Sequence, residues 1–296
     1  MDLIHALDES KIRYEKDMPL SRLSSFKIGG PADLFVMPES SDELKTVLCL
    51  AKEAGVKTLT VGNMSNLLFS DEGFRGAVIT TKAMSGIKAD GKCVTADAGV
   101  SLSSLAGFCR KNSLSGAEFL YGIPGTVGGG VYMNAGAYGS SVSDILTSSV
   151  CLDGEIFKTV PAPEHAFSYR ESIYKKRGGT IVSATFSLAF GDPDAILSTM
   201  EGFMSKRRAS QPLDKPSAGS VFKRPEGHFA GKLIEDAGLK GTRIGGAAVS
   251  EKHAGFIVNT GGAASSDVKK LIELIKNRVF ERFGVMLEEE IIEVAP

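Results

Sequence analysis

A strip of closely spaced glycines near the middle of the chain constrains its fold more than any other feature. It reads Tyr121-Gly-Ile-Pro-Gly-Thr-Val-Gly-Gly-Gly-Val-Tyr-Met-Asn-Ala-Gly-Ala-Tyr-Gly139. Glycine is needed where the backbone takes φ > 0 or approaches another group closely. These glycines alternate with apolar and aromatic residues, so the strip is able to lie flat against a planar, partly apolar ligand. A series of ordinary tight turns is the alternative.

The composition is that of a soluble globular protein with a large core. The 296 residues are 43% hydrophobic and 23% charged, which excludes disordered and collagen-like chains. The 34 Lys and Arg residues balance 35 Asp and Glu residues, so no positive excess is available to bind a nucleic acid. No segment offers an uninterrupted leader or the ~20 apolar residues of a membrane span. We therefore expect a cytoplasmic protein without membrane or nucleic-acid partners.

Cysteine and histidine patterns predict no metal site. Cys49, Cys93, Cys109 and Cys151 form no CxxC pair, and each lies in an apolar or strand-like setting. We expect four reduced, buried thiols. The four histidines show no paired spacing either, so a catalytic role has to rest on other residue types.

The order of expected elements indicates an α+β protein. Ser40 to Glu43 has capping-box spacing before a helix that ends at Gly55, and strands flank this helix at 34 and at 58–62. Hairpins are expected at 88–99 and 148–160, a helix at 101–111, and a strand at 180–190 whose buried face ends in Phe190. Helices at 194–208, 229–237 and around 268–279, and strands at 247–249, 255–259 and 285–294, complete the chain.

The turn Val61-Gly-Asn-Met-Ser-Asn-Leu-Leu68 follows an expected strand. Its backbone N–H groups and short side chains suit phosphate oxygens, although an ordinary Asn/Ser turn explains it equally well. It matches neither a P-loop nor a GxGxxG motif.

Seven motifs in one order resemble the UDP-N-acetylenolpyruvoylglucosamine reductase family. They are Ser25 to Pro31, Gly62 to Leu68, Gly122 to Gly139, Phe167 to Ser172, Ala218 to Pro225, Gly231 to Gly238 and Gly255 to Asn259. The resemblance covers nearly the whole chain. It implies an α+β fold: two FAD-binding subdomains of the vanillyl-alcohol oxidase type, residues 1–82 and 83–210, then a smaller α+β substrate-binding domain, residues 211–285, and a C-terminal strand, residues 286–296, returning toward the active site.

The resemblance also implies the cofactor and its contacts. The pyrophosphate of FAD is expected at Gly62, Asn63, Met64, Ser65, Asn66 and Leu67, and its isoalloxazine beside Gly122, Pro124, Gly125, Thr126, Gly128, Gly129, Asn134 and Ala135. Neither segment contains His or Cys, so the FAD is expected to be non-covalent. Asn63-Met64 stands where relatives commonly have further glycine, which is expected to shift the loop without abolishing phosphate binding.

The implied reaction is the NADPH-dependent reduction, through FAD, of UDP-N-acetylglucosamine enolpyruvate to UDP-N-acetylmuramate for peptidoglycan. Arg170 matches the residue that pins the substrate carboxylate, and Ser220 matches the proton donor. Glu290 would hydrogen-bond the developing enolate, which requires a buried, protonated carboxyl. Without the resemblance, Arg170 is an ordinary surface ion-pair former and Ser220 a turn residue. In a strand, alternation puts Glu288 and Glu290 on one face and cannot decide which face enters the site.

Donors for the nucleotide diphosphate are expected at Tyr138, Tyr169, Lys223, Arg224 and Lys232. Some relatives carry a tyrosine-bearing lid between the Arg and Ser motifs. The short spacing from Arg170 to Ser220 places this chain in the shorter subtype without that lid. A monomer is expected. A flavin oxidase of the same fold and a non-catalytic nucleotide-sugar binding protein are the two rival functions.

Overall fold

The computed structural model describes residues 2–296, which form two compact units. Unit 1 consists of Met1–Lys16, Leu34–Asn63 and Gly76–Lys206. Unit 2 consists of Asp17–Asp33, Met64–Arg75 and Arg207–Pro296. Each unit is therefore assembled from three separate stretches of the chain.

A small α/β sheet forms the N-terminal part of the fold. Its strand order is β1 (Tyr14–Pro19), β2 (Pro31–Val36), β5 (Phe74–Thr80) and β3 (Thr58–Val61), with β3 parallel to β5. Helix α3 (Ser41–Glu53) connects β2 to β3, and α1 (Leu3–Glu9) packs against it. The predicted N-cap is confirmed, because the Ser40 hydroxyl accepts from the Glu43 N–H at 3.1 Å. The reciprocal half of the capping box differs, since the Glu43 carboxylate accepts at 2.8 Å from the N–H of Glu39 and not from that of Ser40.

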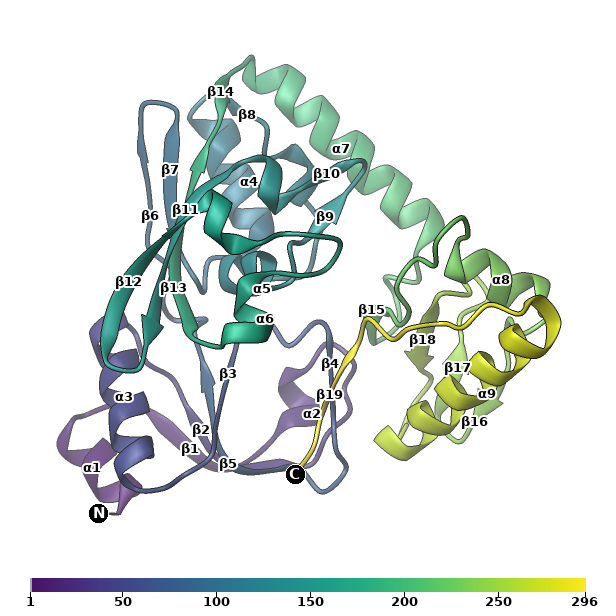
Figure 1. The fold of residues 1–296 in the computed structure, drawn as a ribbon, viewed down its shortest axis with the longest axis horizontal. Helices are drawn as coiled ribbons and strands as arrows, with labels where there is room; N and C mark the ends of the chain where they lie inside the picture. The colour runs from purple at the N-terminus through teal and green to yellow at the C-terminus, as the bar shows by residue number, and fades with distance from the viewer. Residues whose placement is uncertain (1) are drawn as a thin grey trace. The chain divides into compact units, whose positions relative to one another are not determined.

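An antiparallel sheet of five strands forms the centre of unit 1 (Figure 1). Its order is β12 (Ile156–Pro161), β11 (Leu146–Asp153), β13 (Thr180–Ser187), β7 (Cys93–Asp97) and β6 (Ile87–Asp90). Both predicted hairpins are present here. Val94, Ala96, Ala184 and Phe186 face a buried core, since none is more than 1% exposed. This packing follows from the period-2 alternation of apolar residues along β7 and β13.

Short elements and helices complete unit 1. They are α4 (Leu102–Lys111), β8 (Leu114–Ser115), η1 (Glu118–Leu120), α5 (Val127–Tyr132), β9 (Gly136–Ala137), β10 (Ser140–Ser141), η2 (Val142–Asp144), η3 (Ala162–His165), α6 (Ile173–Arg177), β14 (Ala189–Phe190) and α7 (Pro193–Ser210), which continues past Lys206. Helix α4 begins as predicted, because the Ser101 hydroxyl accepts from the Ser104 N–H at 2.9 Å.

A four-stranded sheet and two helices form the core of unit 2. The order is β15 (Ser217–Ser220), β18 (Phe256–Asn259), β17 (Ala247–Val249) and β16 (Arg243–Ile244), all antiparallel. Helices α8 (Ala230–Asp236) and α9 (Ser265–Phe283) lie against each other. The predicted apolar face of α9 is buried, at Val268, Leu271, Ile272, Ile275 and Val279. Each such side chain contributes roughly 1.5–3 kcal/mol on burial.

A late strand of the chain pairs with a much earlier one within unit 2. Strand β19 (Ile292–Val294) pairs in parallel with β4 (Leu67–Phe69), in the register Ile292 to Leu67 (Figure 1). Helix α2 (Leu20–Leu23) precedes the motif Ser25 to Pro31 in the same unit. Among residues 2–296, no helix combines the length and the apolar character that a membrane crossing requires.

Three sequence expectations are wrong. The strand expected over 285–294 exists only at Ile292–Val294, because the backbone changes partner: the Glu290 N–H donates to Val221 O and the Ile292 N–H to Asn66 O. Phe190 is 65% exposed, since β13 ends at Ser187 and β14 starts a separate pairing with β8. All four cysteines are free, but Cys93 is exposed and Cys49 half-buried; only Cys109 and Cys151 are buried.

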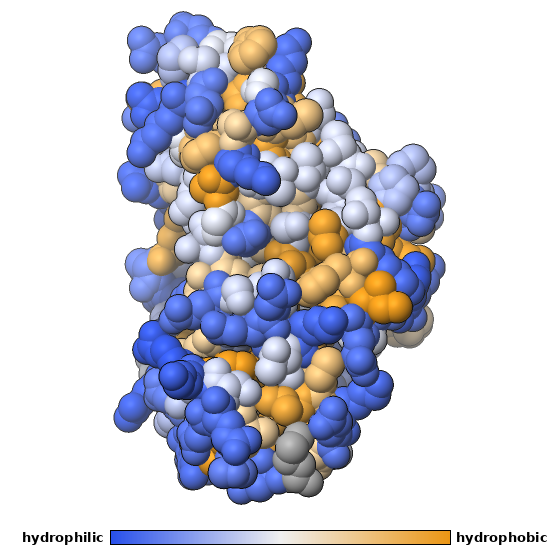
Figure 2. Space-filling view, turned by 90° about the vertical axis from the view of Figure 1, so that its left-hand side faces the viewer, coloured by the Kyte–Doolittle hydropathy of each residue, from blue (hydrophilic) through white to orange (hydrophobic). Residues whose placement is uncertain are grey.

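Hydrophilic residues prevail on the face shown in Figure 2, with hydrophobic residues in patches among them. The large apolar side chains of unit 1 that remain exposed include Ile156, Phe157 and Phe190. Single exposed apolar residues are normal on protein surfaces. They provide no argument for a function.

Candidate active site

The loop after β3 has amide groups available for a ligand. Within residues 2–296, the N–H groups of Gly62, Asn63, Met64 and Ser65 donate to no other protein group. Gly62 has to be glycine, because a Cβ there would overlap the Thr126 hydroxyl. Met64 has φ +49°, a conformation that glycine adopts readily, so this position would also suit a glycine. The chain thus keeps the loop's shape with a methionine.

The glycine strip contains a helix that the sequence did not predict. Thr126 is the N-cap of α5, and the first amides of this helix are already bonded: Val127 N–H donates to Val100 O at 2.8 Å and Gly128 N–H to Ala98 O at 2.9 Å. A Cβ on Gly130 would lie 3.1 Å from Leu102. Part of the glycine density therefore permits close packing of α5 on its own unit. The exposed or half-buried Pro124, Gly125 and Gly129 remain accessible to a ligand.

Beyond α5 the strip forms a tight hairpin. Tyr138 (φ +56°) and Gly139 (φ +88°) connect β9 to β10, and two positive φ angles are the signature of a type I′ turn. The Tyr138 ring stacks on Phe203 with ring centroids 4.2 Å apart, and its hydroxyl donates to Phe203 O at 2.7 Å. The hydroxyl proton of this predicted substrate ligand is thus engaged within unit 1.

Arg170 lies on a turn of four residues in unit 1. Ser168 and Glu171 exchange backbone hydrogen bonds of 3.3 and 3.2 Å, and Arg170 at the turn has φ +59°. The guanidinium lies 5.1 Å from the centroid of the exposed Tyr169 ring, and Nη2 donates to Gly136 O at 3.5 Å. The turn thus places a half-buried cation next to the end of the glycine strip.

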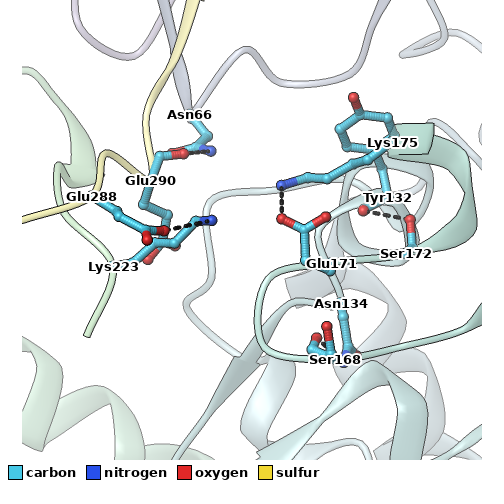
Figure 3. A network of polar contacts seen from close by, with 10 residues as sticks. All are labelled: Asn66, Tyr132, Asn134, Ser168, Glu171, Ser172, Lys175, Lys223, Glu288 and Glu290. Atoms are coloured by element: carbon cyan, nitrogen blue, oxygen red, sulfur yellow. Dashed lines mark hydrogen bonds and ion pairs between the residues drawn. The ribbon is translucent and has the colours of Figure 1, made fainter. Parts of the chain in front are cut away.

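Side chains from two directions support this turn (Figure 3). The Asn134 amide donates to Ser168 O at 3.0 Å, and the Ser172 hydroxyl donates to Tyr132 O at 2.7 Å. Asn134 itself is buried, with φ +42°. Asn134 was predicted as a cofactor contact, but in the structure its amide bonds the Arg170 turn.

Sequence reasoning gave no site role to Lys175, a cation that pairs with the residue after Arg170. Lys175 Nζ lies 3.5 Å from Glu171 Oε1, and the Lys175 side chain is only 17% exposed. Its ammonium lies 6.0 Å from the centroid of the Tyr132 ring. Burial raises the pKa of Tyr132, and the Glu171 carboxylate raises it further. The i,i+4 spacing of Glu171 and Lys175 at a helix start was the available signal.

Ser220 and Glu290 lie on neighbouring backbone segments of unit 2. Residues 221–223 and 288–290 form an antiparallel bridge between Phe222 and Glu289. On either side of it, Lys223 N–H donates to Glu288 O at 2.8 Å and Glu290 N–H to Val221 O at 2.7 Å. Val221 N–H donates to Gly255 O at 2.9 Å, which fixes the end of β15. The backbone itself therefore positions both predicted residues.

The three consecutive glutamates have three different environments. Glu288 is 76% exposed and lies 3.4 Å from Lys223 Nζ, whereas Glu289 lies 3.0 Å from Lys276 Nζ of α9. Glu290 is half-buried, and the Asn66 amide donates to its backbone oxygen at 2.9 Å (Figure 3). These contacts distinguish the three residues, which strand alternation alone did not.

The motif Ser25 to Pro31 joins the same part of unit 2. The Ser25 hydroxyl donates to Ser217 O at 2.7 Å, and the Asn259 amide donates to Phe26 O at 3.2 Å. Segments from both ends of the chain thus support β15. The sequence order of these motifs gave no sign of this convergence.

The remaining predicted diphosphate donors lie further along unit 2. Arg224 stacks over the exposed Phe229, with 4.6 Å between the guanidinium carbon and the ring centroid. Lys232 on α8 lies 2.6 Å from Asp236, and this hydrogen bond raises the pKa of Lys232. Both cationic side chains are exposed.

The predicted residues divide between the units. Gly62, Asn63, the glycine strip, Tyr138, Tyr169 and Arg170 belong to unit 1, whereas Met64 to Leu67, Ser220, Lys223, Arg224, Lys232 and Glu290 belong to unit 2. Within the described residues, no group of three His, Cys, Asp or Glu side chains is arranged to hold a metal ion. The donor set is thus one of amides, hydroxyls and cations, which suits phosphate and carboxylate oxygens.

Both halves of the chain match known protein families. Residues 32–159 match the FAD binding domain model, and residues 211–294 match the model of the UDP-N-acetylenolpyruvoylglucosamine reductase C-terminal domain. A protein of Caldicellulosiruptor bescii is 48% identical over 288 residues, which cover 96% of this chain and 92% of that relative. One of Clostridioides difficile is 44% identical over 294 residues, 98% and 96% of the two chains. Both are named UDP-N-acetylenolpyruvoylglucosamine reductase.

Solved structures agree with these matches. The crystal structure of UDP-N-acetylenolpyruvylglucosamine reductase (MurB) from Thermus caldophilus has a TM-score of 0.81 at 33% identity, covering 96% of this chain and 99% of that one. BBE-like 1 of Physcomitrella patens has a TM-score of 0.51 at 15% identity, covering 64% and 44%, and bears on the fold alone. The predicted α+β architecture with an FAD-binding fold is confirmed.

Proposed function

Since the chain belongs to the UDP-N-acetylenolpyruvoylglucosamine reductase family, we propose that Arg170, Ser220 and Glu290 carry its chemistry. The protein is an FAD-containing oxidoreductase that reduces UDP-N-acetylglucosamine enolpyruvate to UDP-N-acetylmuramate with NADPH, a step of peptidoglycan precursor synthesis. The observation that carries the residue assignment is the backbone bridge between 221–223 and 288–290, which brings the Ser220 and Glu290 segments together in unit 2.

The residues present fit FAD. Bound FAD supplies hydride transfer between NADPH and the vinyl carbon of the enol ether. The unbonded amides of Gly62 to Ser65 and the side chain of Ser65 are suited to pyrophosphate oxygens. Pro124, Gly125 and Gly129 present little side-chain bulk to the flat ring system. No histidine or cysteine occurs in either segment, which favours non-covalent binding.

Arg170 neutralises the substrate carboxylate. Its planar guanidinium forms two parallel hydrogen bonds with a carboxylate, which a lysine is unable to do. As hydride reaches the vinyl carbon, negative charge develops toward this carboxylate, so a fixed cation stabilises the transition state more than the bound substrate. The 168–171 turn keeps the guanidinium close to the glycine strip through Gly136.

Ser220 and Glu290 complete the addition at the neighbouring carbon. Ser220 supplies the proton that this carbon requires, and Glu290 is the proposed partner of the developing enolate. The burial expected for the Glu290 carboxyl is only partial, since this residue is half-buried. Ser220 follows Gly219, which has φ +77° and therefore fixes the end of β15 in a shape that favours glycine.

The cationic side chains of unit 2 are the proposed partners of the nucleotide diphosphate. Lys223, Arg224 and Lys232 lie on or near the segment after Ser220, and Tyr169 of unit 1 is a further proposed donor. Tyr138, also expected as a donor, instead donates its hydroxyl proton to Phe203 O. The short spacing from Arg170 to Ser220 favours the subtype without a tyrosine lid. Cytoplasmic location, the monomeric state and the division into residues 1–82, 83–210, 211–285 and 286–296 stay predictions.

An anaerobic spectrum tests the function directly. The purified holoenzyme is expected to show a flavin band that NADPH bleaches and that UDP-N-acetylglucosamine enolpyruvate restores. Recovery only on admitting oxygen would favour the oxidase, and a colourless protein that still binds the UDP-sugar would favour the binding protein. Either result contradicts the proposed reaction.

A further inference from the structure

A buried chain of three polar side chains in unit 1 takes no part in the proposed reaction. The Ser149 hydroxyl oxygen lies 2.8 Å from His165 Nε2 and 2.6 Å from the Tyr174 hydroxyl oxygen. Ser149, His165 and Tyr174 are 1%, 0% and 3% exposed. Polar groups buried to this extent are costly unless every one of them has a partner.

The direction of each hydrogen bond in this series of three side chains follows from the bond between His165 and Pro161 O. Pro161 O only accepts, so His165 Nδ1, 3.0 Å away, carries the proton that it donates. Burial lowers the pKa of His165, which keeps the ring neutral and leaves Nε2 as an acceptor. The Ser149 hydroxyl therefore donates to Nε2, and the Tyr174 hydroxyl donates to Ser149. Burial also raises the pKa of Tyr174, so its proton stays in place.

The three residues connect a fixed strand to both ends of the Arg170 segment. Ser149 lies in β11, where it faces Val160 of β12 and Ala184 of β13, so hydrogen-bonded strands hold its backbone from both sides. His165 ends η3 and Tyr174 belongs to α6. Between these two anchors run residues 166–173, which carry the turn at Arg170. One hydroxyl of a central strand thus binds both sides of this segment.

Residues 166–173 need such support because two of them have an unfavourable backbone conformation. Ala166 has φ +47° and Arg170 has φ +59°, in the left-handed region that disfavours L side chains. The apolar contacts of the segment lie toward its two ends, where Phe167 stacks on the His165 ring at 4.9 Å between centroids and Phe167 and Ile173 pack against the core, whereas Tyr169 beside the turn is exposed. Without these anchors, we expect the turn to adopt conformations of lower free energy in which Arg170 points elsewhere.

We propose that Ser149, His165 and Tyr174 are positioning residues that hold Arg170 where it meets the substrate carboxylate. This inference rests on the proposed role of Arg170. A nucleophilic role for Ser149, which its contact with a histidine suggests, is unsupported, because its 1% exposure leaves no access for a substrate. The charged neighbours Glu164 and Arg177 act on His165 and Tyr174 but bond neither.

The test compares Ser149→Ala with Thr185→Val in the holoenzyme. Thr185 bonds Thr95 across the same sheet at 3.0 Å and lies outside the 166–173 segment, so it controls for loss of one hydrogen-bonded, half-buried hydroxyl of this sheet. After anaerobic reduction by NADPH, Ser149→Ala is expected to slow reoxidation by the enol ether roughly 10- to 100-fold, the usual effect of misplacing a catalytic group by about 1 Å. Flavin reduction by NADPH is expected to stay within about twofold of wild type, and Thr185→Val to behave as wild type in both steps.

Two further readouts separate positioning from general damage. Amide hydrogen exchange of residues 166–173 is expected to accelerate in Ser149→Ala and not in Thr185→Val. In an Arg170→Lys background, Ser149→Ala is expected to cost little more, because the group it positions is already gone. Tyr174→Phe, which keeps the ring and removes only the hydroxyl, serves the same purpose if Ser149→Ala fails to fold; its effect is expected to be smaller, since Ser149 still bonds His165.

The outcomes distinguish the two levels of the proposal. Equal slowing of both half-reactions, or the same cost of Ser149→Ala with and without Arg170, would overturn the positioning role. If Arg170→Lys slows reoxidation while Ser149→Ala and Tyr174→Phe do not, the positioning role is wrong and the proposed role of Arg170 stands. If Arg170→Lys leaves reoxidation unchanged, the assigned role of Arg170 is wrong, and the positioning role with it.

Discussion

The Arg170 turn of unit 1 and the Ser220 to Lys223 segment of unit 2 are both near the proposed chemistry, yet different contacts hold them. Three side chains, those of Asn134, Ser172 and Ser149 through its partners, support the turn. Backbone hydrogen bonds to residues 255 and 288–290 hold the segment. Backbone hydrogen bonds thus hold the proposed catalytic residues of unit 2 in place, whereas side-chain hydrogen bonds hold Arg170 of unit 1.

This difference has an energetic consequence. Backbone pairing survives most substitutions, because every residue except proline carries the same donor and acceptor. Side-chain support disappears with a single substitution and leaves the opposing group unsatisfied. We therefore expect substitutions in unit 1 to lower the reaction rate even at residues that never contact the substrate. In unit 2 we expect such losses only at residues proposed to contact the substrate, Ser220 and Glu290 above all.

The largest effect is expected at Ser220. Ser220→Ala should slow reoxidation of the reduced enzyme by the enol ether about a thousandfold, since general acid catalysis contributes ~10²–10⁴. Flavin reduction by NADPH should stay nearly intact, because only the second half-reaction needs this proton. Stopped-flow spectra of both half-reactions measure this. Equal loss in both would contradict the role of Ser220 as proton donor.

Arg170→Lys should follow with a loss of about a hundredfold in the same half-reaction. Lysine keeps the charge but forms no bidentate contact, and removal of one preorganised donor typically costs ~10²–10³. The affinity for the enol ether, measured by titration of the oxidised enzyme, should fall less than the rate. If Arg170→Lys reoxidises at the normal rate, Arg170 takes no part in the reaction, and the comparison between its turn and the Ser220 segment no longer concerns two catalytic positions.

A matched pair of serines tests the comparison itself. Ser172 donates to Tyr132 O and Ser25 to Ser217 O, each at 2.7 Å, so both variants to alanine lose one similar hydrogen bond. Ser172→Ala should slow reoxidation roughly tenfold, because it loosens the start of α6 beside the Arg170 turn. Ser25→Ala should change the rate by less than about twofold, since backbone pairing still holds β15.

Stability should differ little between this pair, because each loses one hydrogen bond worth about 1 kcal/mol. Urea unfolding of the two variants supplies that control. Equal slowing by both, or slowing by Ser25→Ala alone, would mean that the kind of contact does not decide how a catalytic residue is held.

The smallest effect concerns pH. Burial lowers the pKa of His165 and of His253 in the folded protein, whereas the unfolded chain takes up a proton near pH 6.5. The unfolded state thus binds more protons below that pH, so stability is full above about pH 6.5 and falls as the pH drops toward the lowered pKa values. Each histidine contributes at most about 1.4 kcal/mol per pH unit.

His165→Asn should remove one of these two contributions. Asparagine retains a donor toward Pro161 O but does not titrate, so the slope of unfolding free energy between pH 6.5 and 5 should become shallower. Glu164, the charged neighbour whose field raises the pKa of His165, is unchanged in this variant. A slope identical to wild type would show that His165 does not take up a proton on unfolding.

Local patterns in the sequence predicted most elements of the fold. The Ser40 and Ser101 caps, the Asp90-Gly91 and Asp153-Gly154 hairpins and the apolar face of α9 follow from rules that act within a few residues. The prediction of a strand over 285–291 was wrong, because the backbone there forms hydrogen bonds with segments far away in the sequence. Helix α5 was missed, because glycine has a low helix propensity and α5 is stabilised by packing on Ala98 and Leu102.

For the candidate site, residue types and the order of the motifs indicated which residues to consider. The sequence did not predict how their side chains are placed. Arg170 and Ser220 stood out only through resemblance, and strand alternation could not separate Glu288 from Glu290. Their different partners, Lys223 for Glu288 and Asn66 for the Glu290 backbone, come from long-range contacts. The buried Ser149, His165 and Tyr174 carried no signal at all, since a serine in a strand and a histidine after a proline are ordinary.

The pairing of β4 with β19 has a consequence for synthesis of the chain. Leu67 to Phe69 leave the ribosome early, whereas their partners Ile292 to Val294 are made much later. Unit 2 therefore completes its fold only once residues 292–294 are available, and contacts this distant in sequence form slowly. A chain shortened by its last few residues would leave this early strand without a partner, so premature termination removes a structural element from the other end of the protein.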